Sequence, residues 1–152
     1  MVNRTLTKRI ALPKVDLDLV RQYCSLDDTD NDKLLYQYIS GAFDAAELKT
    51  RRFFTQSEVA LNTFDDEITL KSKVDRIIEV KVGGIGTTSY KMQGNTLVFD
   101  TVSDIQVKYS TVEDVTNGVL MFVLKYVLHQ LERNNPDRGE LDYSDLSPYF
   151  EQ

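Results

Sequence analysis

The order of its apolar patterns constrains this chain most. Apolar residues recur at helical spacing in Asn31–Arg52, and several short stretches within Glu67–Tyr109 alternate apolar and polar residues. A second helical pattern, much denser in apolar residues, covers Asn117–Glu132. This order predicts an α+β fold: a small helical bundle with an inserted antiparallel β section or hairpin, and a long apolar C-terminal helix followed by an extended tail.

Length and charge narrow the class of protein. The 152 residues are enough for one domain with a real core. The net charge of −6 argues against a protein that grips phosphate backbones over most of its surface, but not against one that encircles DNA without holding it. The longest apolar stretch, Val119–Leu131, is too short to span a bilayer and contains Lys125, so no membrane segment is expected.

Composition divides the chain into three parts. Residues 1–14 hold four basic residues and no acidic one, which is typical of an extended N-terminal arm or of a disordered terminus. Residues 15–133 are predicted to form a single domain, and residues 134–152 a C-terminal tail. The elements expected in that domain are helices at 15–24 and 31–53, strands within about 67–109, and a helix at 117–133.

Two segments are candidates for contacts. The tail holds five acidic residues yet also spaced apolar ones, and it either orders against a partner or folds back on its own domain. Gly94 and Asn95 lie between two strand patterns and predict a hairpin turn, because both residues tolerate positive φ. The apolar residues of the tail that we single out are Tyr143, Leu146, Tyr149 and Phe150.

Two apparent binding motifs are incomplete. Asp28, Asp30 and Asp32 have calcium-loop spacing, but the sixth position is Lys33 rather than glycine and the twelfth is Ile39 rather than glutamate. Gly84-Ile85-Gly86 begins like a dinucleotide fingerprint, but Tyr90-Lys91-Met92 continues as a strand where a helix is needed. We therefore predict helix capping and a loop at these places, and no cofactor.

Catalytic chemistry has little support. One cysteine, Cys24, and one histidine, His129, cannot make a zinc site, and His129 lies on the most apolar helix. An acidic cluster, Asp65-Asp66-Glu67, is usually a solvated loop. We predict no catalytic residue and no metal site, and a protein that is not an enzyme.

Several local features follow one another in a recognisable order. An acidic run precedes Asp32-x-Leu34-Leu35, and then come Ile39, Gly41-Ala42, Glu47-x-x-Thr50-x-Arg52, Ile105–Tyr109 and the apolar stretch Val119–Arg133. In these residues, and chiefly in the order of its elements over about Val15–Arg133, the chain resembles a known family, the small head–tail connector (adaptor) proteins of tailed bacteriophages.

The resemblance implies a structural protein of the virion neck, assembled in the host cytoplasm. Such adaptors form a ring, usually a dodecamer, under the portal protein. They extend the DNA channel, through which DNA passes without specific binding, and they present a surface to a stopper or tail-completion protein. On this reading Tyr143, Leu146, Tyr149 and Phe150 dock on the portal or an adjoining ring, and Gly94-Asn95 contacts a neighbouring subunit or the next neck component.

Besides the adaptor role, two other functions are the main alternatives. One is a stopper or tail-completion protein one ring lower in the same neck. The other, from a different class, is a small soluble DNA-binding or regulatory module, for which a salt-dependent DNA shift would be the test. A small hydrolase using Asp65-Asp66-Glu67 ranks third.

Overall fold

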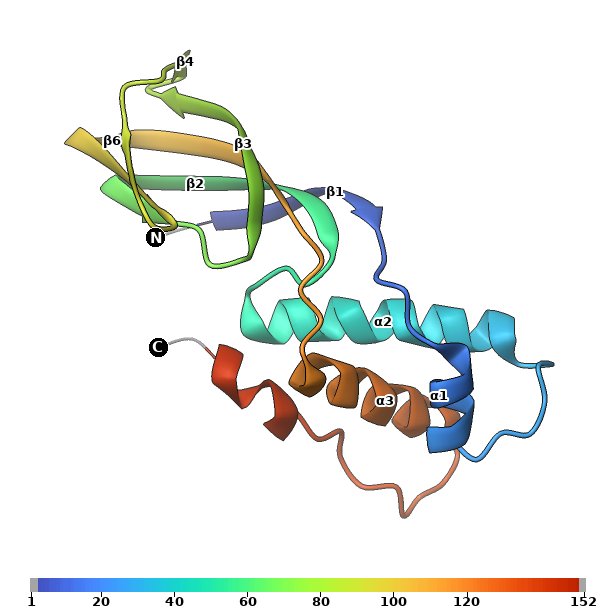
Figure 1. Ribbon diagram of the computed structural model, residues 1–152. Coiled ribbons are helices and arrows are strands. Elements are labelled where there is room, and N and C mark those ends of the chain that lie inside the picture. The colour runs from blue at the N-terminus through green and yellow to red at the C-terminus, as the bar shows by residue number, and fades with distance from the viewer. Residues whose placement is uncertain (1–2, 151–152) are drawn as a thin grey trace. The chain divides into compact units, whose positions relative to one another are not determined.

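The computed structural model describes residues 3–150, which form two compact units. The sheet unit combines the N-terminal residues up to Leu12 with Phe53–Asp114. The helical unit combines Pro13–Arg52 with the chain from Val115 onward. The segment 53–114 thus leaves and re-enters the helical unit, as the predicted insertion of a β section between two helices requires (Figure 1).

The sheet unit is one antiparallel sheet with the strand order β1-β2-β6-β3-β4, in which β5 also pairs with β6 (Figure 1). Its long members, β2 and β6, pair in two stretches whose registers differ: Asp65 faces Ser103, but Glu67 faces Val98. This bulge bends both strands, so that the sheet curls on itself. The strands are β1 (Asn3–Ala11), β2 (Gln56–Thr69), β3 (Val74–Val82), β4 (Ile85–Gly86), β5 (Lys91–Gln93) and β6 (Thr96–Thr111).

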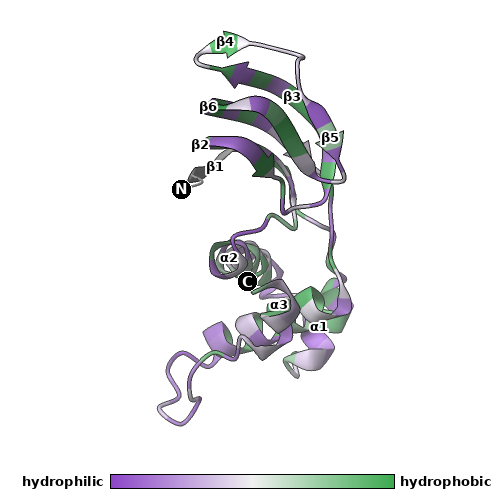
Figure 2. Ribbon diagram, turned by 90° about the vertical axis from the view of Figure 1, so that its left-hand side faces the viewer, coloured by the Kyte–Doolittle hydropathy of each residue, from purple (hydrophilic) through white to green (hydrophobic). Residues whose placement is uncertain are grey.

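The curl encloses the core of this unit. Figure 2 shows hydrophobic and hydrophilic residues alternating along the strands, as expected where one face is buried. In the first of the two stretches where β2 and β6 pair, Tyr109, Val59 and Ile105 are fully buried. Ile68 and Leu97 face each other across β2 and β6 in the second half and belong to the same core.

The helical unit contains α1 (Leu17–Tyr23), α2 (Asp32–Thr50), α3 (Asn117–Leu131) and the 3-10 helix η1 (Ser144–Tyr149). α3 packs against all three of the others. Its side chains Phe122 and Val123 are completely buried, whereas Met121 is 36% exposed. None of the helices in residues 3–150 is long and apolar enough to cross a membrane.

The structure confirms the α+β class and the hairpin. Gln93 of β5 faces Thr96 of β6 across the two-residue turn Gly94-Asn95, and Gly94 has a φ of 61°. The predicted helices at 15–24 and 31–53 correspond to α1 and α2 with shorter bounds. Whether residues 15–133 behave as a single domain stays a prediction.

Three expectations need correction. The described part of the N-terminal arm, residues 3–11, forms β1, which is paired with β2 in the sheet. The long apolar C-terminal helix expected at 117–133 is shorter, because α3 has fifteen residues and ends at Leu131. The tail is not extended, because η1 occupies Ser144–Tyr149 and packs on α3. Residues 1–2 and 151–152 of the predicted arm and tail lie outside the described residues.

β2 also begins at Gln56, well before the predicted strand start near residue 67. Its first half points Ser57 and Thr63 into the interior together with Val59 and Leu61. The inward row is therefore half polar, which hides the two-residue period from a hydropathy pattern.

Candidate interaction surfaces

The C-terminal segment folds back on the helical unit. Leu146 has no exposed surface, and the Tyr143 ring stacks on Phe122 with centroids 5.3 Å apart. The Tyr149 hydroxyl lies 2.6 Å from the hydroxyl of Thr116, the residue that caps the N-terminus of α3. The tail therefore folds back on its own chain, which is one of the two alternatives left open by the sequence. Docking of this segment on a partner stays a prediction, for which the half-buried Tyr143, Tyr149 and Phe150 retain some exposed surface.

An ionic node holds the same segment on α3. Lys125 Nζ lies 3.0 Å from an oxygen of Asp142 and 2.6 Å from one of Asp145. Asp145 first, and then Asp142, raise the pKa of Lys125. The Ser144 backbone N–H, its hydroxyl and then Lys125 lower the pKa of Asp142 to about 2. Both partners are therefore charged at neutral pH, and the acidity of the tail serves in part to bind α3.

A glycine permits this contact. A Cβ atom built on Gly118, in the first turn of α3, would lie 2.7 Å from the carbonyl oxygen of Asp145. No real side chain tolerates that distance to a backbone atom. Gly118 therefore sets how closely the first turn of η1 approaches the helix.

The C-terminal end of α2 carries a surface that the sequence analysis did not single out. Leu48 is 84% exposed, and Arg51, the C-cap, is exposed in the left-handed conformation with a φ of 58°. Lys49 Nζ lies 5.0 Å from the centre of the Tyr143 ring and 5.9 Å from that of Phe150, and Arg52 lies over Tyr149 at 5.8 Å. We call Leu48, Lys49, Arg51 and Arg52 the basic end of α2.

A signal for this surface was present in the sequence. The apolar stripe at helical spacing in this helix consists of Leu35, Tyr38, Ile39, Ala42 and Ala46, all of which are buried except the half-buried Tyr38. Leu48 falls outside that stripe, and three basic residues follow it within four positions. An off-stripe leucine beside several cations is a pattern that merits attention as a contact surface.

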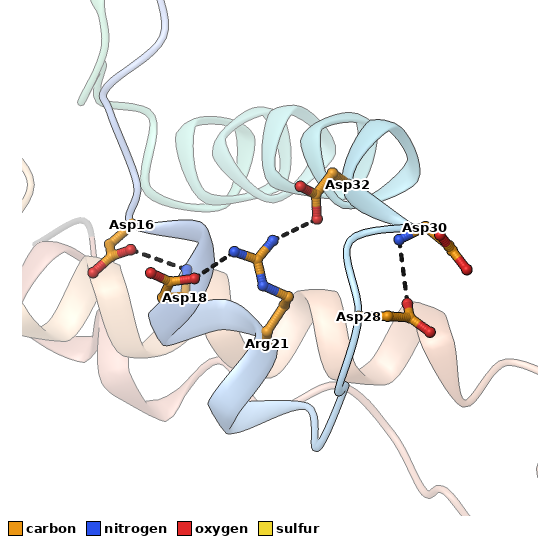
Figure 3. A network of polar contacts seen from close by, with 6 residues as sticks. All are labelled: Asp16, Asp18, Arg21, Asp28, Asp30 and Asp32. Carbon is orange, nitrogen blue, oxygen red and sulfur yellow. Dashed lines mark hydrogen bonds and ion pairs between the residues drawn. The ribbon is translucent and has the colours of Figure 1, made fainter.

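The opposite end of α2 is acidic (Figure 3). Arg21 forms ion pairs with Asp18 and Asp32, and both carboxylates raise its pKa. Asp16 accepts a hydrogen bond from the Asp18 N–H at 2.9 Å and so caps α1, and Asp28 accepts one from the Asp30 N–H at 3.2 Å. The capping predicted for Asp28, Asp30 and Asp32 is not found, because the N-cap of α2 is Asn31, which makes no side-chain cap bond.

Not all of these carboxylates are engaged. Within residues 3–150, Asp27 and the Asp30 side chain make no ion pair or hydrogen bond, and both residues are exposed. Tyr36, one turn into α2, is 59% exposed. We call Asp27, Asp28, Asp30 and Tyr36 the acidic end of α2.

The sheet unit contributes two exposed features. The hairpin residues Gly94 and Asn95 are both exposed, and Met92 beside them is 46% exposed. At the bend of the sheet, Phe64 is 71% and Val102 56% exposed. An open cavity of about 380 Å³ is lined by residues of β2, β3 and β6, namely Ala60, Leu61, Asn62, Glu79, Gln106, Val107 and Lys108.

The residues considered for chemistry divide between the two units, since Cys24 and His129 belong to the helical unit and Asp65 to the sheet unit. His129 Nε2 is 3.2 Å from the Gly139 carbonyl oxygen, so the ring contacts the C-terminal segment. Burial, with a smaller effect of Glu132, raises the pKa of Cys24 to about 11, which leaves its thiol unreactive at neutral pH. Asp65 accepts from the Asp66 N–H, which lowers its pKa, and stays in solvent. In the described part of the chain, no three His, Cys, Asp or Glu side chains group as metal ligands do.

Solved structures with a similar fold come from gene transfer agent (GTA) particles. A chain in the neck of an empty GTA particle, with C6 symmetry, matches with a TM-score of 0.69 and 11% identity, covering 100% of this chain and 96% of that one. A chain in the virion of the native particle matches with a TM-score of 0.68, 11% identity and the same coverage. A third, in the neck of the native particle with C12 symmetry, gives 0.66 and 10% identity over 97% of this chain and 96% of that one.

No family model and no curated protein matches the sequence. At about a tenth identity, the likeness concerns the fold. Over nearly its whole length, the chain shares the fold of chains found in the neck of gene transfer agent particles.

Proposed function

We propose that this chain is a structural, non-enzymatic component of the neck of a phage-like particle, where its copies form an adaptor ring between the portal vertex and the tail. The observation that carries the proposal is the full-length match, since both the helical unit and the sheet unit fall inside the aligned 100% of the chain. A shared single motif would not cover 96% of the other protein as well.

The physical properties of the chain support this role. The net charge of −6 suits the wall of a channel through which DNA slides, because like charge discourages sticking. α3 retains partly exposed apolar residues, Leu120, Met121, Leu128 and Leu131, that a neighbouring chain would shelter. Neither property requires a cofactor or a substrate.

The contacts with other neck proteins follow from the exposed parts. The C-terminal segment would meet the portal through Tyr149 and Phe150, whereas Leu146 would act from inside by holding η1 in shape. The hairpin at Gly94-Asn95 would reach a neighbouring subunit or the next ring. Portal binding by the variant Phe150→Ala is compared with that by Leu141→Ala, a matched control at another half-buried residue of the same segment. Loss of binding in Phe150→Ala alone indicates loss of docking, and equal loss in both variants indicates loss of shape.

The test is removal of the chain from the producing host. An adaptor is needed to join two finished parts, so we expect DNA-filled heads and free tails that do not join, seen by negative-stain microscopy. Normal tailed particles would refute the proposal. The alternative role within the neck, a stopper or tail-completion protein, lies further from the portal than an adaptor does. The composition of heads made without this chain distinguishes the two roles, because loss of an adaptor also removes every neck protein below the portal.

A further inference from the structure

We infer that the basic end of α2 binds the acidic end of α2 in a second copy of this chain, so that copies associate head to tail through the helical unit. The inference rests on the proposed ring, and it names the two surfaces that would build it. Neither surface was among the contact residues expected from the sequence.

The first step is the exposure at the basic end. Leu48 is 84% exposed, the highest value among the exposed large hydrophobic residues of the described chain. Arg51 is exposed beside it and forms no hydrogen bond or ion pair with the rest of residues 3–150. An apolar side chain with an unpaired cation at its rim has the composition of a small contact surface.

The second step is charge complementarity. The acidic end offers Asp27 and Asp30, whose carboxylates are unengaged, and Tyr36, which is 59% exposed. Tyr36 can cover Leu48 while the two carboxylates meet Arg51 and Lys49. Tyrosine combines a large apolar face with a polar tip, which is why it is enriched in interfaces.

The third step is direction. α2 has 19 residues and is therefore ~28 Å long, with carboxylates at one end and cations at the other. Two copies that met through like ends would repel each other, and unlike ends attract. Such a contact is heterologous, and repetition of a heterologous contact closes a ring when the rotation permits.

Cysteine pairs test the contact directly. One population carries Leu48→Cys and a second carries Tyr36→Cys, while the native Cys24 is buried in both. After mixing and mild oxidation, we expect a disulfide-linked heterodimer on a non-reducing gel, well above the homodimers of either population alone. A control mixture replaces Tyr36→Cys by Ser89→Cys, which places a thiol at an exposed position between β4 and β5, outside the proposed contact surfaces.

Charge reversal then tests the cause. Adding Asp27→Lys and Asp30→Lys to the Tyr36→Cys population should lower the heterodimer yield roughly tenfold, and adding Arg51→Glu to its partner should restore it. High salt should weaken the unmodified pair. The inference is overturned if no heterodimer forms, if the Ser89→Cys control matches it, or if charge reversal has no effect.

A particle experiment separates this inference from the proposed function. If the chain forms a ring in the neck but the cysteine pair fails, the ring uses other surfaces and only this inference is wrong. If the wild-type chain is absent from the neck, the proposed function fails, whatever the gel shows.

Discussion

Single residues fix the C-terminal segment to the helical unit. Leu146 is the one fully buried side chain of η1, and Lys125 joins the segment to α3 through Asp142 and Asp145. The sequence singles out Leu146 but leaves open whether its segment folds back or docks outward. That choice depends on whether Phe122 and Lys125 lie opposite the segment, and such long-range placement leaves no local pattern.

Replacement of Leu146 by alanine should destabilise the protein strongly. Truncation of a fully buried leucine leaves a cavity and costs about 2–5 kcal/mol. Leu48→Ala makes the same chemical change at an exposed site and should alter the free energy of unfolding by less than ~0.5 kcal/mol. Urea unfolding measures both, and similar values for the two variants would contradict the placement of η1.

The variant Asp142→Asn should show, through the pH dependence of stability, how much the ion pair between Asp142 and Lys125 stabilises the fold. The folded pKa of Asp142 is about 2, below the unfolded value of about 4, so its ionised form stabilises the fold. That contribution is complete above pH ~4 and disappears as the pH falls to ~2. We expect the variant to melt at a lower temperature than the wild type at pH 7, and the difference to vanish near pH 2. A difference that is constant with pH would exclude an electrostatic origin.

The elements show where local reasoning succeeds. α2 and the Gly94-Asn95 turn follow from a strong apolar stripe and from turn chemistry, both of which are local. β1 was read as an arm because a basic segment gives no sign of its pairing partner, which lies about fifty residues away in β2. The early part of β2 was missed because Ser57 and Thr63 point inward.

Gly118→Ala should loosen η1 without unfolding α3. The new methyl would meet the Asp145 carbonyl oxygen at 2.7 Å, so the first turn of η1 must withdraw, although alanine favours the helix itself. Hydrogen exchange should therefore speed up in Ser144–Tyr149 and stay slow in the centre of α3. Gly86→Ala is the control, since nothing lies within 4 Å of its added Cβ; equal exchange changes in both variants would show that the contact does not matter.

The fold of the whole molecule is the basis on which we propose its assembly. The order of apolar patterns indicates the connector resemblance, and the solved chain of similar fold, at 11% identity, comes from the neck of a gene transfer agent particle. The number of copies, the neighbours in the neck and the surfaces used between copies are properties of an assembly. They depend on complementarity between chains, which one sequence encodes only as exposed residues such as Leu48 and Phe64.

The most direct test of the neck assignment is a cryo-electron microscopy map of the particle that contains this chain, reconstructed around the portal vertex. The account predicts identical copies of both units arranged as a closed ring around the DNA channel, next to the portal. Density for the chain only in the head shell or at the far tip of the tail, or no ring of copies around the channel, would contradict it.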